Sequence, residues 1–260
     1  MLQSLRIAAT GMNAQQLNVD VLSNNIANLN TTGYKQQNAA FTDLVYQNRI
    51  GVGAITSEAG TLAPTGLQIG LGVSVGSTYK SMKQGSLNGT GNPFDLAVSG
   101  RGFFRITMPD GTTTYTRDGS LQLNQDGQIV TKEGYTFDPA ISVPTNATDF
   151  TVTATGVVTA KVNNVTTQLG TITLSMFTNE AGLENIGQNL YRETEASGAP
   201  TDTNPAEQGA GTISQSFLES SNVDAVESIT RLITAQRAYE LNSRVISTAD
   251  EMLQTLTQLR

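Results

Sequence analysis

Apolar residues recur at every seventh position near the start of the chain. Two rows carry this repeat, offset by three positions: Leu5, Met12, Val19 and Ile26, then Ala8, Gln15, Leu22 and Leu29, in which Gln15 is the one polar residue. Such an a/d repeat predicts an amphipathic helix that buries a narrow seam. The predicted helix covers residues 1–32, because Gly33 is suited to the left-handed conformation that ends a helix.

The last part of the chain has a second helical pattern, over residues 222–260. Ser221-Asn222-Val223-Asp224 is typical of a helix N-cap. An apolar stripe follows, with a change of phase between Ile233 and Leu241 that resembles a coiled-coil stutter. We expect the stripe to pack the helix, and it comprises Val226, Ile229, Ile233, Leu241, Val245, Thr248, Met252, Leu256 and Leu259.

The middle of the chain is rich in Thr, Gly, Asn and Val, which predicts β-structure with many turns. Asp110-Gly111, Asp118-Gly119 and Asp126-Gly127 recur at a spacing of eight, and each is suited to a tight hairpin turn. The predicted class is α+β, in which the two terminal helices pair as a coiled-coil stem and a β-rich outer domain is inserted between them. We expect three parts: a stem of residues 1–32 and 222–260, an extended or β connecting region of 33–94 and 205–221, and a β-rich outer domain of 95–204.

A pair of helices with narrow apolar seams leaves much of its surface in water, and helices need tertiary burial for stability. The polar face of the first helix is rich in Asn and Gln and carries few charges. One interpretation is that other copies of the chain bury the remaining faces. The alternative is an ordinary helical hairpin packed on the β-rich domain.

Composition narrows the possible functions. Charged residues make up 14% of the 260 residues and the net charge is −7, so neither nucleic-acid binding nor membrane-surface binding is expected. No segment is apolar enough to span a bilayer, and no cleavable signal peptide is expected. The chain has no Cys, His or Trp, which removes the commonest general base and metal ligand. We therefore expect no catalytic, cofactor or metal site.

Two short motifs suggest chemistry, but each has a simpler interpretation. Ser77 and Lys80 fit the S-x-x-K pattern of serine acylases, although the segment is predicted to be a strand and the partner motifs are absent. Residues 122–133 partly match a calcium loop, but Asp126-Gly127 is better explained as a hairpin turn.

Three segments resemble a known family. Residues 23–35 (SNNIANLNTTGYK), 95–104 (DLAVSGRGFF) and 221–259, which includes QRAYE at 236–240, are similar to motifs of the rod and hook axial proteins of the bacterial flagellum. The three motifs occur in the family's order over nearly the full length. The motif residues that match are Asn24, Asn25, Asn28, Gly33, Tyr34, Gln236, Arg237 and Tyr239. The length favours a rod member over the longer hook proteins.

The resemblance implies a structural, non-enzymatic subunit of the basal-body rod. Such subunits polymerise into a straight helical tube that transmits torque and encloses the export channel. The implied location is the periplasm, after type III export without a cleavable signal. The implied partners are further copies of the chain, other rod proteins, the hook protein, a rod cap, the bushing rings of the wall and outer membrane, and the export apparatus.

Alternatives remain at this stage. Within the family, the chain could be another axial subunit, such as a proximal rod or hook-like protein. Outside it, a secreted β-rich binding module would use the middle domain and not need its ends.

The resemblance also suggests a role for residues 46–66. We hypothesise that they form a wedge between subunits that prevents the tube from bending.

Overall fold

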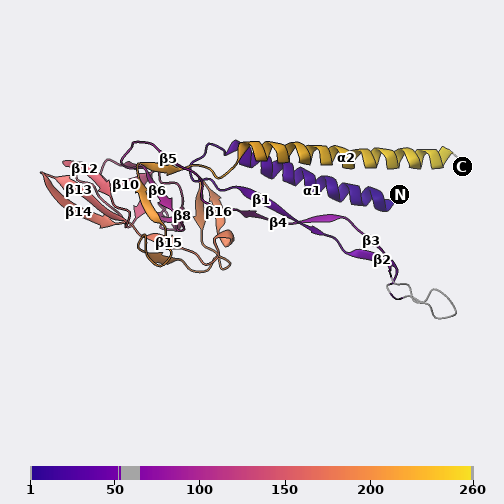
Figure 1. The fold of residues 1–260 in the computed structure, drawn as a ribbon, viewed down its shortest axis with the longest axis horizontal. Helices are drawn as coiled ribbons and strands as arrows, with labels where there is room; N and C mark the ends of the chain where they lie inside the picture. The colour runs from indigo at the N-terminus through magenta and orange to yellow at the C-terminus, as the bar shows by residue number, and fades with distance from the viewer. Residues whose placement is uncertain (1, 52, 54–64, 259–260) are drawn as a thin grey trace. The chain divides into compact units, whose positions relative to one another are not determined.

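The computed structural model describes residues 2–51, 53 and 65–258. It has an α-helix at each end of the chain and β-structure between them, which confirms the α+β class and the inserted β-rich part (Figure 1). The chain forms two compact units. We call them the helical unit (Met1–Ile26, Gln37–Tyr79 and Ala225–Arg260) and the β unit (Ala27–Gln36 and Lys80–Asp224).

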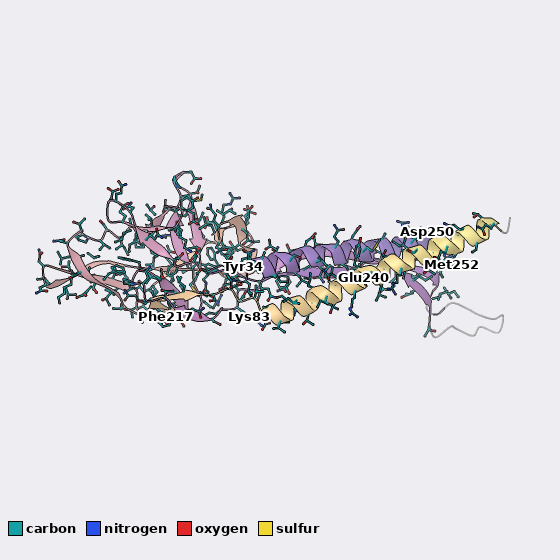
Figure 2. All side chains as sticks on the ribbon, turned by 90° about the horizontal axis from the view of Figure 1, so that it is seen from above. Tyr34, Lys83, Phe217, Glu240, Asp250 and Met252 are labelled. Atoms are coloured by element: carbon teal, nitrogen blue, oxygen red, sulfur yellow. The ribbon has the colours of Figure 1, made fainter. Side chains whose placement is uncertain are left out.

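Helices α1 (Leu2–Ala27) and α2 (Ala225–Gln258) run antiparallel and side by side in the helical unit (Figures 1 and 2). They approach closely at Gly11, where an added Cβ would lie 2.9 Å from Nδ2 of Asn242 on the other helix. A glycine at this position therefore permits the close approach of the two helices.

Both helices are shorter than the sequence predicts. Helix α1 ends at Ala27, and Asn28 accepts hydrogen bonds from the amide of Thr31 (3.2 Å) and from its hydroxyl (3.1 Å), which forms a turn. Gly33 has the expected positive φ of 69°, but it lies beyond this turn and not at the helix end. Helix α2 begins at Ala225, because the side chain of Asn222 is used in contacts with other segments.

The helical unit also contains two antiparallel strand pairs. Strand β1 pairs with β4, and β2 pairs with β3, where Tyr46 lies opposite Gly70. The last residue of β4, Lys80, already belongs to the β unit. Residues 52 and 54–64 of the hypothesised wedge lie outside the described residues. The strands are β1 (Gln37–Asp43), β2 (Tyr46–Ile50), β3 (Leu67–Gly70) and β4 (Val73–Lys80).

The β unit is built on a seven-stranded sheet of order β16-β17-β8-β7-β11-β10-β9, together with a three-stranded antiparallel sheet β12-β13-β14 and the pairs β15-β18, β19-β6 and β20-β5. A short 3₁₀ helix, η1, spans Glu180–Gly182. The strands are β5 (Leu87–Gly89), β6 (Leu96–Ser99), β7 (Phe104–Thr107), β8 (Thr113–Thr116), β9 (Leu121–Leu123), β10 (Ile129–Thr131), β11 (Thr136–Asp138), β12 (Ala147–Val152), β13 (Val157–Val162), β14 (Val165–Thr171), β15 (Leu174–Met176), β16 (Glu184–Gly187), β17 (Leu190–Arg192), β18 (Thr201–Thr203), β19 (Thr212–Gln215) and β20 (Phe217–Glu219).

Two of the three predicted Asp-Gly turns join hairpins. Asp110-Gly111 lies between the paired strands β7 and β8, and Asp126-Gly127 lies between β9 and β10. The hairpin prediction for Asp118-Gly119 is wrong, because β8 and β9 do not pair with each other. Gly119 is needed for a different reason: an added Cβ would collide with the carbonyl oxygen of Leu96, whose amide donates to the carbonyl of Gly119 (2.9 Å).

Two apolar clusters form the core of the β unit. The smaller one is aromatic: the rings of Phe103 and Tyr115 each lie edge-on to Phe177, with centroids 5.8 Å and 4.8 Å apart. The larger cluster comprises Leu96, Val98, Phe104, Leu121, Ile129, Phe137, Ile141, Val143, Val152, Val158, Ile172, Leu174 and Ile213.

The motifs that suggested chemistry have structural explanations. Asn124 Oδ1 accepts hydrogen bonds from the amides of Asp126 and Gln128 (both 2.9 Å), which stabilises a hairpin turn at the proposed calcium loop. Ser77 and Lys80 lie on strand β4, so they do not have the helical spacing of an acylase pair. Among the described residues, no group of three His, Cys, Asp or Glu side chains could hold a metal ion.

Candidate functional site

The predicted seam residues of α1 are partly covered in the single chain. Leu22 is buried, whereas Leu5, Met12, Val19 and Ile26 are half-buried. Leu29 lies in the turn after the helix and is also half-buried. The apolar face of α1 therefore has partners within the chain but keeps exposed area.

The predicted stripe of α2 lies mostly in solvent. Exposed fractions are 47% for Ile233, 61% for Leu241 and 47% for Val245, and they are similar for Ile229 and Met252. Leu256 belongs to α2, but its side chain is not described, and Leu259 lies outside the described residues. We call Ile229, Ile233, Leu241, Val245 and Met252 the α2 stripe; the helix and its side chains, with Met252 labelled, are drawn in Figure 2.

The buried positions of α2 are small residues. Ser228, Ala235 and Ala249 are at most 2% exposed, and Asn242, between them in the same seven-residue spacing, faces Gly11 of α1. This series continues without the change of phase seen in the α2 stripe. Small side chains allow two helices to approach closely. The large apolar residues of the α2 stripe stay exposed, whereas Leu232, Ile246 and Leu253 of the same helix are half-buried.

The family-motif residues have different environments. Asn25 is fully buried: its Nδ2 donates to the carbonyl of Gln37 (2.7 Å) and its Oδ1 accepts from the amide of Gln37 (2.9 Å). The side chain thus joins the end of α1 to the start of β1. Asn28 closes the turn after α1, Gly33 and Tyr34 are buried in the β unit, and Asn24, Gln236, Arg237 and Tyr239 are exposed.

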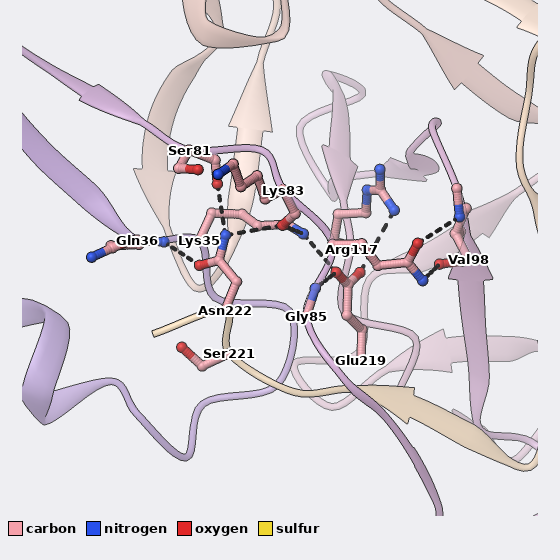
Figure 3. A network of polar contacts seen from close by, with 12 residues as sticks. Lys35, Gln36, Ser81, Lys83, Gly85, Val98, Arg117, Glu219, Ser221 and Asn222 are labelled. Carbon is pink, nitrogen blue, oxygen red and sulfur yellow. Dashed lines mark hydrogen bonds and ion pairs between the residues drawn. The ribbon is translucent and has the colours of Figure 1, made fainter. Parts of the chain in front are cut away.

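A buried ionic cluster lies within the β unit (Figure 3). Lys35 Nζ is 2.6 Å from Glu219 Oε1, and Arg117 Nη1 is 3.6 Å from Glu219 Oε2. Each of the three residues is at most 2% exposed. Burial is the main cause that lowers the pKa of Lys35 and of Arg117 from their ordinary values, and the Glu219 carboxylate opposes both shifts. We call these three residues the ionic cluster.

Asn222 adds an uncharged part to the same network (Figure 3). Its Oδ1 accepts a hydrogen bond from the amide of Gln36 (2.6 Å), and its Nδ2 donates to the carbonyls of Ser81 and Lys83 (2.9 Å each). Glu219 Oε1 also accepts from the amide of Gly85 (2.8 Å). The network therefore joins three chain segments: residues 33–36, 81–85 and 219–222.

Lys80 lies close to two tyrosines of the β unit. Its Nζ is 5.4 Å from the ring centroid of Tyr34 and 4.9 Å from that of Tyr191, distances at which a cation is attracted to an aromatic face. Burial lowers the pKa of Lys80 from 10.5 to about 8. Because an amine with a lowered pKa loses its proton at a lower pH, Lys80 is expected to be substantially neutral in mildly alkaline solution.

Amine acetylation should therefore show an unusual pH profile at Lys80. We expect the rate of acetylation, followed by peptide mass spectrometry on the folded chain, to have its midpoint near pH 8. An N-acetyl-lysine amide in the same tube should have its midpoint near pH 10.4, about the ordinary value for lysine. The shape of the profile is compared and not the absolute rate, since Lys80 is half-buried. A Lys80 midpoint at or above that of the free amide would contradict the assignment.

Sequence reasoning did not single out Arg117 or Glu219, and it noticed Lys80 only as part of the S-x-x-K match. Lys35 and Asn222 were noticed only as parts of longer motifs. The partners in the ionic cluster are far apart in the chain, with 184 positions between Lys35 and Glu219. No local signal in the sequence marks these residues, since each has polar neighbours in the chain.

The described helices include none that is long and apolar enough to cross a membrane.

Three family models match the chain. "Flagella basal body rod protein" matches residues 5–35, "Flagellar hook protein FlgE/F/G D1 domain" matches residues 97–160, and "Flagellar basal body rod FlgEFG protein C-terminal" matches residues 214–259. They correspond to α1 with its exit, to much of the β unit, and to β20 with α2.

Full-length relatives agree with these matches. The flagellar basal-body rod protein FlgG of Caulobacter vibrioides is 52% identical over 261 residues, covering 100% of both chains. The FlgG protein of Agrobacterium fabrum is 51% identical, covering 96% of this chain and 97% of its own. The FlgG protein of Bacillus subtilis is 39% identical, again covering 100% of both. The chain therefore belongs to the family of flagellar basal-body rod proteins.

Proposed function

We propose that this chain is the structural subunit of the distal part of the flagellar rod. Copies of it would form a straight helical tube that transmits torque and encloses the export channel. The proposal is carried by similarity along the whole chain to proteins named as basal-body rod proteins. The partners we propose are other rod proteins, the hook protein, a rod cap, the bushing rings and the type III export apparatus. The proposed location is the periplasm, reached without a cleavable signal.

The exposed α2 stripe supports a polymer. Five large apolar residues on one helix are about half exposed in the single chain, and burying such side chains contributes about 1.5–3 kcal/mol each when they go from fully exposed to buried. We propose that neighbouring copies cover this stripe, together with the exposed parts of the α1 seam. The same residues would then be part of the subunit interface.

We further propose that α1 and α2 form a coiled-coil stem that lines the tube. Two observations support it: the seven-residue spacing of the buried positions Ser228, Ala235 and Ala249, and the contact of Gly11 with Asn242. The three-part division into stem, connecting region and outer domain is retained as a proposal for the assembled subunit.

Two aspartates in the α2 stripe should prevent assembly. In the full-length chain, Ile233→Asp with Leu241→Asp is expected to raise the critical concentration for polymerisation by about 100-fold or more, because two half-exposed apolar side chains are replaced by charges that resist burial. Polymer is measured by sedimentation. Unfolding of the monomer should change little, since both side chains are exposed in the single chain.

The matched control places the same two charges on exposed serines of the same helix, Ser243→Asp with Ser247→Asp. This control should assemble at a critical concentration much nearer to that of the unmodified chain. If the stripe variant polymerises as well as the control, the α2 stripe is not a subunit interface. If the unmodified chain forms no polymer under any condition that supports rod growth, the polymer proposal itself fails.

A further inference from the structure

The chain passes between its two units at four places, and the segments on the β-unit side of these crossings are bonded to one another. Segment 33–36 follows α1, segment 81–85 follows β4, and segment 219–222 precedes α2. We propose that the ionic cluster and Asn222 form a positioning device, which holds these exit segments in one fixed arrangement in the single chain. The proposal concerns the monomer and does not require a polymer.

The backbone contacts place the two helix exits side by side. The amide of Gly33 donates to the carbonyl of Glu219 (2.8 Å), and the amide of Asn222 donates to the carbonyl of Tyr34 (3.4 Å). Asn189 Nδ2 donates to the carbonyl of Thr32 (2.7 Å), which anchors the first exit to the turn between β16 and β17. Side chains at the same place add further bonds between these segments.

The side chains of the ionic cluster connect the segments at the same point. Glu219 is the only anion of the ionic cluster and lies between two cations that come from different segments, Lys35 from the first exit and Arg117 from the residues after β8. The guanidinium of Arg117 also lies 5.2 Å from the ring centroid of Phe103, in the aromatic core cluster. The carboxylate thus connects both exits to the core of the β unit.

Burial makes this arrangement specific. A buried carboxylate with two buried cations has a strong preference for one geometry, because any displacement leaves a charge without its partner in a medium of low dielectric constant. Arg117 Nε and Nη1 and Glu219 Oε2 form no hydrogen bond within the described residues, so the ion pairing is what compensates their burial. Asn222, in segment 219–222, adds bonds to the other two segments without adding charge.

Distance measurements between spin labels test the proposal in the full-length monomer. The chain has no Cys, so Asn30→Cys with Asp224→Cys gives a single labelled pair that reports the separation of the two exits. We expect one narrow distance peak. Glu219→Gln should replace that peak by a broad distribution. Lys35→Met removes the link from the first exit to Glu219, so it should broaden the peak, but less than Glu219→Gln does, because the Arg117–Glu219 pair stays balanced. A control pair within the β unit, Gln122→Cys with Thr166→Cys, should keep its distribution in all folded variants.

A residue that only stabilised the fold would give a different result: fewer folded molecules, each with the same narrow peak. If Glu219→Gln does not fold, Asn222→Ala decides the matter, since it keeps the ionic cluster and removes only the bonds between segments. The proposal is supported if Asn222→Ala loses the narrow peak while the control pair is unchanged. It is overturned if the exit pair stays narrow in every folded variant, whether or not the chain polymerises.

Discussion

Replacing Glu219 by Gln is expected to lower the free energy of unfolding of the β unit by about 3–5 kcal/mol. The substitution keeps the size and shape of the side chain, so no cavity is formed. It removes the only negative charge of the ionic cluster and leaves two buried cations, Lys35 and Arg117, without a counter-charge. The amide group of the new side chain can accept from the amide of Gly85, but its NH₂ group would face a cation.

The matched substitution Lys35→Met should lower the free energy of unfolding of the β unit much less. Glu219 keeps the amide of Gly85 and the charge of Arg117, and the carbonyl of Lys83, which accepts from Lys35, keeps its bond from Asn222. Each former partner of the ammonium therefore retains another contact. Methionine can fill most of the volume, and replacing buried ionic groups by apolar ones of similar volume is often nearly neutral.

Urea unfolding of the full-length chain, followed by tyrosine absorption, measures both effects. The double variant Lys35→Met with Glu219→Gln should be more stable than Glu219→Gln alone, because one of the two uncompensated cations has been removed. Equal losses for the two single variants would show that the balance of charge does not determine the stability of this region.

Substituting Gly119 by Ala is expected to destabilise the β unit by about 3 kcal/mol or more. The added methyl group would collide with the carbonyl oxygen of Leu96, which is part of the backbone and cannot rotate away as a flexible side chain could. Relief requires a shift of the start of β6 or of the chain before β9, and this disturbs the bond from the Leu96 amide to the Gly119 carbonyl. Leu96 also belongs to the main core cluster, so the shift reaches the core.

Gly111→Ala is the control for this prediction. Gly111 has a positive φ of 82°, but no atom of the described residues lies within 4 Å of an added Cβ. Its substitution should cost only the strain of a left-handed alanine, about 1–2 kcal/mol. The two variants are compared by thermal unfolding of the full-length chain. If Gly111→Ala is the more harmful change, close backbone packing is not the reason for glycine at position 119.

The family relationship confirms that the chain is a structural protein and not an enzyme. That conclusion was accessible from the sequence because it depends on local features. A seven-residue repeat predicted the first helix, an N-cap pattern followed by an apolar stripe predicted the second, and the density of turn residues predicted β-structure between them. Motifs such as residues 23–35 are contiguous, so no tertiary structure is needed to recognise them.

The helix ends and turns were predicted less well. Asp118-Gly119 has the same sequence as two real hairpin turns, yet the strands on either side pair with other strands. The start of α2 was placed too early, because Asn222 resembles a helix cap but bonds to residues 36, 81 and 83. In both cases local chemistry allowed two structures, and long-range contacts selected one.

By itself, the sequence determined which residues are apolar and at what spacing, and from this the class of fold. Its three contiguous motifs indicated the family by resemblance. Only the tertiary structure decided which face of α2 lies against α1. The small residues Ser228, Ala235 and Ala249 are buried there, because they let the helix backbones come close, and the larger apolar residues of the α2 stripe remain exposed. Likewise, only folding brings Lys35, Arg117 and Glu219 together. The sequence shows which residues are charged, but it does not show which of them are buried in contact with one another.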